Sequence, residues 1–324
     1  MFDFTILVAP GGFASAVAAT LDLLNTAAFM APRIGVAKPT WRVLSLAAGP
    51  TLLSNGLSLN AKPLTRRTKP DASIWVVPGL ATQSTASTDA RVLQPDALLA
   101  IKALKAQASS GGVVAASCSA VFLLQAAGLL ENRKATTTWW LAPHLQKLAP
   151  QCAVDANRLV VCDGKVWTAG AAFAQTDLML QLLRARFGTE LADAVSRVLL
   201  IDGREAQAPY IVPTMLANGN TLIAKLSQQI EAAFPHTPSV GEMAAGLCIS
   251  ERTLTRRVRA ATGKGTSALI QFVRLKRARL LLETSRMSVE QVAEQVGYRD
   301  ATALRRLMRK VLAATPRQFR QINN

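Results

Sequence analysis

The chain has 324 residues, of which half are hydrophobic and 18% are charged. This length suits two domains rather than one, and the composition excludes a wholly disordered chain. Lysine and arginine number 37 against 20 acidic residues, and the net charge of +17 favours a polyanionic partner, either nucleic acid or an acidic membrane surface.

Few side chains are available for cross-linking or metal binding. The four cysteines are scattered and the two histidines complete no zinc-ligand spacing, so we expect no disulfide scaffold, no metal and no cofactor. The start of the chain has an acid and no basic segment, which argues against a signal peptide. Residues 107–130 carry no charge, but Gly111 and Gly112 interrupt them, and a strand–turn–helix explains them better than a membrane span. We therefore expect a cytoplasmic protein without membrane contact.

Short apolar strands alternate with helical segments along the first 185 residues. The predicted elements are strands at 4–10, 41–48, 73–79 and 111–117, a hairpin at 158–170, and helices at 16–30, 95–109 and 176–188. Strands separated by helices indicate an α/β sandwich, in which a parallel sheet has helices on both faces.

After Asn218 the strand signal disappears and helical periodicity takes over. The helices are expected at about 220–234, 240–246, 251–262, 266–284, 289–296, 301–312 and 316–321. Residues 218–324 hold 18 basic and 7 acidic side chains, so the basic surface belongs mainly to this part. We expect a sensor domain over 1–190, a linker over 191–217 and an all-α domain over 218–324.

The all-α part contains an internal repeat. The segment 239–250, SVGEMAAGLCIS, matches the segment 288–299, SVEQVAEQVGYR, and the helices that follow align Arg256 with Arg306. Each copy is a short helix, a tight turn and a second helix. The sequence therefore predicts a helix-turn-helix unit twice.

The second helix of each copy is predicted to have an apolar face and a basic face. Leu254, Val258 and Ala261 in one copy, and Leu304, Met308 and Val311 in the other, are expected in the core. Outward arginines can read guanine edges or hold phosphates, and threonines do either more weakly. The candidate DNA contacts are Ser250, Arg252, Thr253, Thr255, Arg256, Arg259, Arg299, Thr302, Ala303, Arg305, Arg306 and Arg309. A solvated face is the alternative, and the recurrence of arginines at equivalent positions argues against it.

Two residues precede these second helices as expected caps, Ser250 and Asp300. The helix between the copies, 266–284, would be roughly 30 Å long at ~1.5 Å per residue. One turn of B-DNA is ~34 Å, so this helix is expected to set two reading heads into successive major-groove faces.

Residues 218–324 resemble the DNA-binding domain of the AraC family of bacterial transcription regulators. The resemblance rests on three motifs in order, MAAGLCISERTLTRRVRAATG, RLKRARLLLETSRMSVEQVAEQVGY and the ending TPRQFR. It implies double-stranded DNA as the partner. Ala303 and Leu304 depart from the family, which usually has a polar residue and Phe there, and Ala314 occupies a variable position. The base preference of the second copy is therefore expected to be unusual.

The segment VVAASCSAVFLL places Cys118 at a sharp strand-to-helix turn, the geometry of a nucleophile elbow. With ILVAPGGFASAVAATLDLLN, SIWVVPG, TTTWW and WTAGAAFAQTDLMLQLL, this segment makes the front half resemble the PfpI-type, glutamine-amidotransferase-like domain. Joined to an AraC-type end, the whole chain is similar to the GlxA-like branch of that regulator family.

Three interpretations of Cys118 follow: a nucleophile, a pocket-lining or redox-sensitive thiol, or an inert buried one. A cysteine hydrolase needs a base within hydrogen-bond reach. Ser119 follows Cys118, and Thr138 stands where many relatives have His. The acid of redox-active relatives is missing after Gly12, and His144 is expected on an exposed helix face. We therefore expect no catalytic residues.

The expected function is regulated, sequence-specific DNA binding by a homodimer, with dimerisation inferred by analogy. The GlxA-like resemblance implies a nitrogen-containing small-molecule effector. Its candidate binding residues are Cys118, Ser119, Thr138 and Trp139. Trp140 and Trp167 either line the same pocket or pack the core. Two rival functions stay open, a Cys-dependent hydrolase or amidotransferase and a non-specific nucleoid-binding protein.

Overall fold

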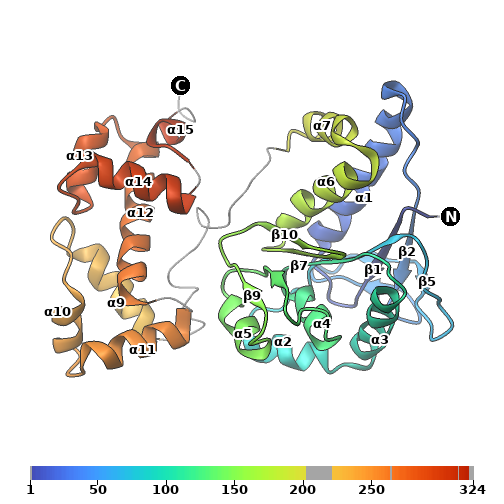
Figure 1. Ribbon diagram of the computed structural model, residues 1–324, viewed down its shortest axis with the longest axis horizontal. Helices are drawn as coiled ribbons and strands as arrows, with labels where there is room; N and C mark the ends of the chain where they lie inside the picture. Colours follow the sequence, from blue (N-terminus) through green and yellow to red (C-terminus); the bar gives the residue numbers. More distant parts are fainter. Residues whose placement is uncertain (1, 202–220, 263–264, 313, 321–324) are drawn as a thin grey trace. The chain divides into compact units, whose positions relative to one another are not determined.

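The computed structural model describes residues 2–201, 221–262, 265–312 and 314–320. The chain forms two compact units, residues 1–205 and 206–324 (Figure 1). The expected start of the all-α domain at 218 falls among residues 202–220, outside the described ones. That boundary therefore stays a prediction.

The first unit is built on a seven-stranded sheet. Its strands, in order across the sheet, are β10 (Val160–Asp163), β11 (Val166–Ala169), β7 (Val114–Ser117), β6 (Ile74–Val77), β1 (Phe4–Val8), β2 (Trp41–Ser45) and β5 (Lys62–Pro63). Every neighbouring pair is parallel except β10 and β11, which form the predicted hairpin. Two small pairs lie outside this sheet, β3 (Thr51–Leu52) with β4 (Ser58–Leu59), and β8 (Lys134–Ala135) with β9 (Ala153–Val154). The predicted, mostly parallel sheet is confirmed.

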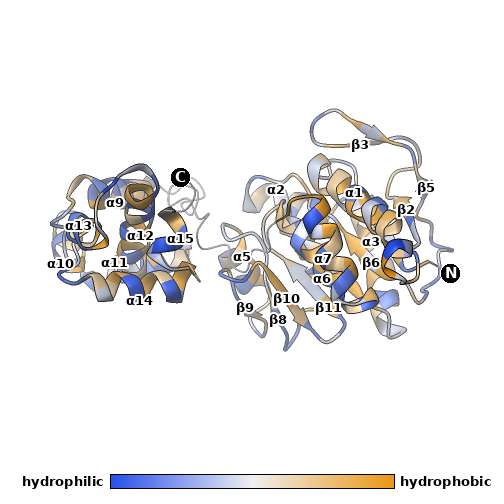
Figure 2. Cartoon of the chain, turned by 90° about the horizontal axis from the view of Figure 1, so that it is seen from above, coloured by the Kyte–Doolittle hydropathy of each residue, from blue (hydrophilic) through white to orange (hydrophobic). Residues whose placement is uncertain are grey.

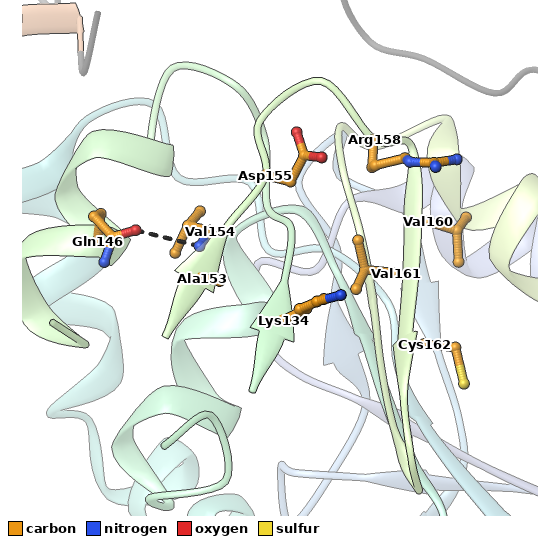
Figure 3. A pocket seen from close by; sticks show the side chains of 9 residues that line it. All are labelled: Lys134, Gln146, Ala153, Val154, Asp155, Arg158, Val160, Val161 and Cys162. Carbon is orange, nitrogen blue, oxygen red and sulfur yellow. Dashed lines mark hydrogen bonds between the residues drawn. The ribbon is translucent and has the colours of Figure 1, made fainter. Parts of the chain in front are cut away.

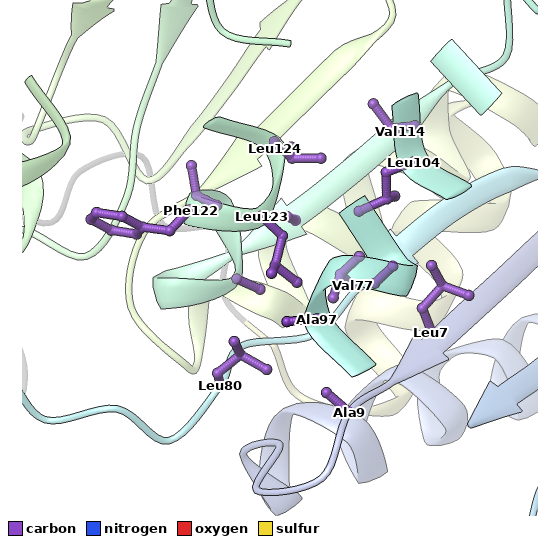
Figure 4. Close-up of a cluster of buried hydrophobic side chains, with 14 of the residues drawn as sticks. Leu7, Ala9, Val77, Leu80, Ala97, Leu104, Val114, Phe122, Leu123 and Leu124 are labelled. Carbon is purple, nitrogen blue, oxygen red and sulfur yellow. The ribbon is translucent and has the colours of Figure 1, made fainter. Parts of the chain in front are cut away.

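Alternate residues of the central strands enter two separate hydrophobic cores. Leu7 of β1 and Val77 of β6 enter the core of Figure 4, whereas Ile6 and Val76 enter the core on the other face. Both faces are covered, so β1 and β6 are buried along their whole length. This double burial explains why the strands read as continuous apolar runs.

Helices cover both faces of the sheet, as predicted. The core of Figure 4 packs under α2 (Thr85–Val92), α3 (Pro95–Ser109), α4 (Val121–Ala126) and α5 (Ala142–Leu148). The other core packs under α1 (Ala14–Met30), α6 (Ala174–Phe187) and α7 (Thr189–Val198). Leu191 and Val195 of α7 are buried there. The first residues of the expected linker 191–217 therefore pack in the core of the first unit.

Helix α1 is long and apolar. Together with η1 (Ala31–Ile34) it is long and apolar enough to cross a membrane by composition, but half of it is buried. Its Leu23 and Leu24 are fully buried in the core shared with α6 and α7. The uncharged stretch 107–130 instead divides into the end of α3, strand β7, η2 (Cys118–Ala120) and α4, as the strand–turn–helix interpretation predicts.

All the regular secondary structure among the described residues of the second unit is helical. Its helices are α9 (Thr221–Ala232), α10 (Val240–Ala245), α11 (Glu251–Thr262), α12 (Thr266–Thr284), α13 (Val289–Gln295), α14 (Ala301–Leu312) and α15 (Pro316–Arg320). Each begins and ends within two residues of a predicted helix. Helices α10 and α11 form the first repeat, and α13 and α14 form the second repeat.

Each repeat has its own buried cluster. Leu254 and Val258 belong to the cluster of the first repeat, and Leu304 and Met308 belong to that of the second. Hydrophobic and hydrophilic stretches therefore alternate along α14 (Figure 2). These four predicted core residues are confirmed, whereas Ala261 and Val311 are only partly buried against the two clusters.

Candidate DNA-binding surface and the elbow at Cys118

Helix α11 presents a row of arginines to solvent. Arg252, Arg256 and Arg259 are exposed, as the helical period predicts, while Val258 is buried. Arg257 is exposed beside them. The sequence analysis did not name Arg257 because the helical period places it next to the core position Val258. An arginine is itself a signal of exposure, and this signal could have identified it.

The hydroxyl residues of the first repeat have structural partners. The Ser250 Oγ accepts a hydrogen bond of 3.2 Å from the backbone N–H of Thr253, which confirms Ser250 as the cap. The two hydroxyl oxygens are 2.9 Å apart. Thr255 is half-buried, and its hydroxyl is 3.4 Å from that of Thr266. Thr255 therefore leans toward α12 instead of pointing straight outward.

Helix α14 presents the corresponding row in the second repeat. All the predicted contacts there are exposed: Arg299, Thr302, Ala303, Arg305, Arg306 and Arg309. Lys310 adds an exposed cation that the sequence analysis did not single out. Asp300 caps the helix by accepting a hydrogen bond of 2.7 Å from the Thr302 backbone N–H, and this bond lowers the pKa of Asp300.

One ion pair distinguishes the two repeats. The Arg305 Nη2 lies 2.7 Å from the Glu290 Oε1, on the first turn of α13. The hydrogen bond from its own backbone N–H and the bond from Arg305 lower the pKa of Glu290. Thr255 occupies the position equivalent to Arg305 in the first repeat. This position therefore carries a cation only in the second repeat, and that cation, Arg305, is paired with Glu290.

The elbow at Cys118 is formed by β7, η2 and α4. Cys118 has a φ of 54°, in the left-handed region that non-glycine residues rarely adopt. Ser119 donates a hydrogen bond of 2.7 Å to the Leu80 carbonyl, and the Thr137 hydroxyl donates one of 2.7 Å to the Cys118 carbonyl. A Cβ at Gly79 would lie only 2.9 Å from the Cys118 Cβ. The segment that follows β6 therefore approaches the elbow closely because Gly79 has no side chain.

The thiol at this elbow is held neutral. Burial raises the pKa of Cys118 to about 11, and hydrogen bonding from Ser119 and Thr138 only partly opposes it. A catalytic thiolate requires the opposite shift. His144 has other partners: its Nε2 lies 2.7 Å from the Asp89 Oδ1, and its ring stacks on that of Phe122. The side chain is only 16% exposed, so the expectation of an exposed His144 is wrong. The α2 carboxylate and the apolar ring hold it inward.

The candidate ligand residues converge but are closed off. Cys118, Ser119, Thr138 and Trp139 are all at most 5% exposed. The rings of Trp139 and Trp140 meet edge to face at 5.0 Å. Trp140 and Trp167 pack against the cores of the two sheet faces, which favours packing over lining a pocket for these two. The elbow is therefore a buried site.

An open cavity of about 590 Å³ lies elsewhere, lined by residues of β8, β9 and the edge strand β10 and by Gln146 of α5 (Figure 3). Its polar lining includes Lys134, Asp155 and Arg158. Gln146 is held in its wall, with its amide nitrogen 2.8 Å from the Cys152 carbonyl. No strong sequence motif marks this cavity, because its lining comes from three separate segments. None of the predicted ligand residues lines it.

No three histidine, cysteine, aspartate or glutamate side chains gather into a possible metal site among the described residues. The described part of the chain thus offers cationic helices and a neutral buried thiol, but no chelating cluster.

Two different family models match the two parts of the chain. The model of a helix-turn-helix domain matches residues 243–322, and that of the DJ-1/PfpI family matches residues 71–185. The chain is 29% identical to the HTH-type transcriptional regulator CdhR of Pseudomonas aeruginosa, covering 99% of this chain and 92% of that protein. It is 27% identical to the HTH-type transcriptional regulator GlxA of Rhizobium meliloti, covering 88% of this chain and 86% of that protein.

Solved structures share the fold of the first unit. The crystal structure of an AraC family transcriptional regulator from Pseudomonas putida matches with a TM-score of 0.50 at 20% identity, over 61% of this chain and all of that one. Drosophila melanogaster DJ-1beta gives the same TM-score and identity, over 62% of this chain and all of that one.

Proposed function

Since this chain is a helix-turn-helix transcriptional regulator that joins a DJ-1/PfpI domain to an AraC-type DNA-binding domain, we propose that both repeats bind promoter DNA and that a small metabolite in the first unit regulates this binding. The exposed arginines of α11 and α14 carry this proposal. They recur at equivalent positions over separate buried clusters, which a merely solvated surface does not require. Guanidinium groups match guanine edges and phosphates.

Footprinting on the DNA upstream of the gene tests the proposal. We expect protection of a defined segment that survives competition with excess random DNA, because base contacts add specificity to phosphate contacts. Equal competition by promoter and random DNA would instead identify a nucleoid-binding protein. Adding amino acids or quaternary amines should change the protected pattern or the affinity.

We place the metabolite at the elbow, among Cys118, Thr138 and their neighbours. The support is the convergence of polar groups from three segments at a strained residue: the side chains of Ser119 and Thr138 and the backbone carbonyl of Leu80. Because this site is buried, the first unit must open near Trp139 to admit a ligand.

Two substitutions locate the sensor. Thr138→Val should abolish the metabolite response while the affinity for DNA without metabolite stays unchanged. Lys134→Ala, in the cavity of Figure 3, is the matched control and should leave the response intact. If Lys134→Ala abolished the response and Thr138→Val did not, the metabolite would bind in that cavity instead of at the elbow.

The first unit is proposed to sense rather than catalyse. A Cys118 that burial keeps neutral, and whose hydrogen-bond partners are Ser119 and Thr138 rather than an imidazole, is a poor nucleophile. Cys118→Ala should therefore leave DNA binding intact and remove no turnover from a panel of esters and amides. A hydrolytic activity that disappears with this substitution would contradict the proposal.

Homodimerisation and a cytoplasmic location complete the proposed function. Dimeric regulators bind paired sites, and DNA-binding regulators act where the chromosome lies. Sedimentation of the full chain without DNA should give twice the mass of 34.5 kDa.

A further inference from the structure

The long helix α12 runs from the core of one repeat into the core of the other. Its Leu269 and Val273 are buried in the cluster of the first repeat. Its Leu275 and Ala278 are buried in the cluster of the second repeat. Arg274 is the residue between these two sets, so its side chain leaves α12 where the two cores meet.

The guanidinium of Arg274 reaches both repeats. Its Nη2 donates a hydrogen bond to the hydroxyl of Thr237, in the segment that leads into α10. Its centre lies 5.1 Å from the ring of Tyr298, in the turn of the second repeat. The guanidinium thus contacts one repeat through a hydrogen bond and the other through the Tyr298 ring, and the compact ammonium of lysine does not reproduce the reach of this forked group.

The same two segments also touch directly. Gly297, in the turn of the second repeat, has a φ of 80°. A Cβ there would lie 2.5 Å from the carbonyl oxygen of Pro235 and 3.3 Å from the Arg274 Nη2. The backbone that precedes the first repeat therefore packs on the turn of the second, and Arg274 closes the junction.

We infer that Arg274 is a positioning residue that fixes the two repeats at one mutual spacing and orientation, so that they engage two DNA segments together. This inference rests on the proposed DNA-binding function. Linked modules gain affinity because the second contact becomes intramolecular, and this gain is largest when the linkage matches the span of the sites. A loosened junction weakens the joint contact without altering either arginine row.

Three related DNA duplexes test this role. One carries the footprinted upstream sequence, a second has one protected segment scrambled, and a third has one base pair inserted between the segments. For Arg274→Ala we expect about a 10-fold loss of affinity for the intact duplex and less than about a 2-fold change for the scrambled one. The penalty for the inserted base pair should shrink as well.

Control variants separate positioning from charge and from folding. Arg277→Ala removes an exposed cation from the same helix. Any loss of affinity that it causes should be equal for all three duplexes. Arg274→Lys keeps the charge but should fail to restore the intact-duplex affinity. Thr237→Val removes one hydrogen-bond acceptor and should give a smaller loss confined to the intact duplex.

The outcomes distinguish this inference from the function on which it rests. If the unmodified chain does not prefer the intact duplex over the scrambled one, the proposed function fails. The positioning role alone is overturned if the unmodified chain does prefer the intact duplex but Arg274→Ala and Thr237→Val lower the affinity equally for all duplexes. It is also overturned if these variants leave the affinity for the intact duplex unchanged.

Discussion

At the scale of single residues, the turn of each repeat depends on one backbone conformation. Cys248 and Gly297 occupy equivalent positions, and both have positive φ, 54° and 80°. Glycine adopts this region freely, whereas other residues are strained there by about 1–2 kcal/mol. The first repeat thus tolerates a strain that the second avoids.

Substitutions at these positions should have opposite effects on stability. Gly297→Ala introduces both backbone strain and a clash with the Pro235 carbonyl, and we expect the free energy of unfolding to fall by about 2–3 kcal/mol. Cys248→Gly should raise it by up to about 1 kcal/mol. Hydrogen exchange of the α10–α14 amides would measure both. Gly246→Ala, at a φ of −62°, is the control and should change little.

The thiols should differ in reactivity. Burial raises the pKa of Cys118 to about 11, so at pH 8 the thiol is almost wholly protonated as well as inaccessible. Iodoacetamide at pH 8 should therefore modify the exposed Cys162 and Cys248 first and reach Cys118 only after unfolding. Mass spectrometry of the peptides gives the order. Early modification of Cys118 in the folded chain would mean that the elbow is open.

The sequence predicts residue exposure well where one helical face decides it. The arginines of α11 and α14 follow the period of their core leucines, so their exposure was predictable. His144 and Thr255 were not, because Asp89 and Thr266, their partners, come from other helices. Periodicity carries no information on such pairing.

At the scale of elements, the first helix of each repeat begins with a capping box, but the two boxes use different side chains. Ser239 and Glu242 form a capping box at α10, and Ser288 and Gln291 form one at α13. Each pair satisfies two backbone N–H groups that have no partner within the helix. The first box titrates through its carboxylate, whereas the second has a neutral amide.

Acid should therefore weaken α10 through Glu242. Hydrogen bonds from the Ser239 backbone and side chain lower the pKa of Glu242. The stability that this carboxylate contributes is present above the unfolded-state pKa near 4.5 and is lost as the pH falls through the lower, folded-state value. Hydrogen exchange of α10 at pH 6 and at pH 3.5 should show this loss, and Glu242→Gln should remove that part of the dependence. An unchanged pH dependence in the variant would contradict the cap's role.

Elements of the second unit were more predictable than those of the first. Caps, apolar periods and the internal repeat fix the ends of α10 to α14 within the sequence itself. The small pair β8 with β9 was missed, because it joins two-residue segments nearly twenty residues apart. Helix α7 was taken as linker, although its amphipathic pattern was visible, because nothing local shows that Leu191 packs against α1 and α6.

At the scale of the whole molecule, the second unit presents two arginine rows joined by one helix. Helix α12 has 19 residues and so spans about 28 Å at ~1.5 Å per residue, close to the ~34 Å turn of B-DNA. The footprint should therefore show two contacted segments centred roughly 10 base pairs apart on one face of the duplex.

Single substitutions should assign each segment to one repeat. Arg256→Ala should weaken one segment and Arg306→Ala the other, whereas Arg66→Ala, an exposed arginine of the first unit, should weaken neither. If either arginine reads a guanine, its loss costs about 1–3 kcal/mol and relaxes preference at that base alone. If it holds a phosphate, affinity falls for all sequences and the salt slope shrinks by about one unit.

The position along each helix decides which of these two effects we expect. Arg252 and Arg305 lie near the starts of α11 and α14, and we expect base contacts from them, since the N-terminal residues of a recognition helix meet the base edges. Arg309 lies further along α14, and we expect a phosphate contact there. To reach a base, Arg305 must leave Glu290, so Glu290→Gln should raise affinity through the second segment only. Methylation interference that shows a single segment, unchanged by Arg305→Ala or Arg306→Ala, would mean that the second repeat does not read DNA.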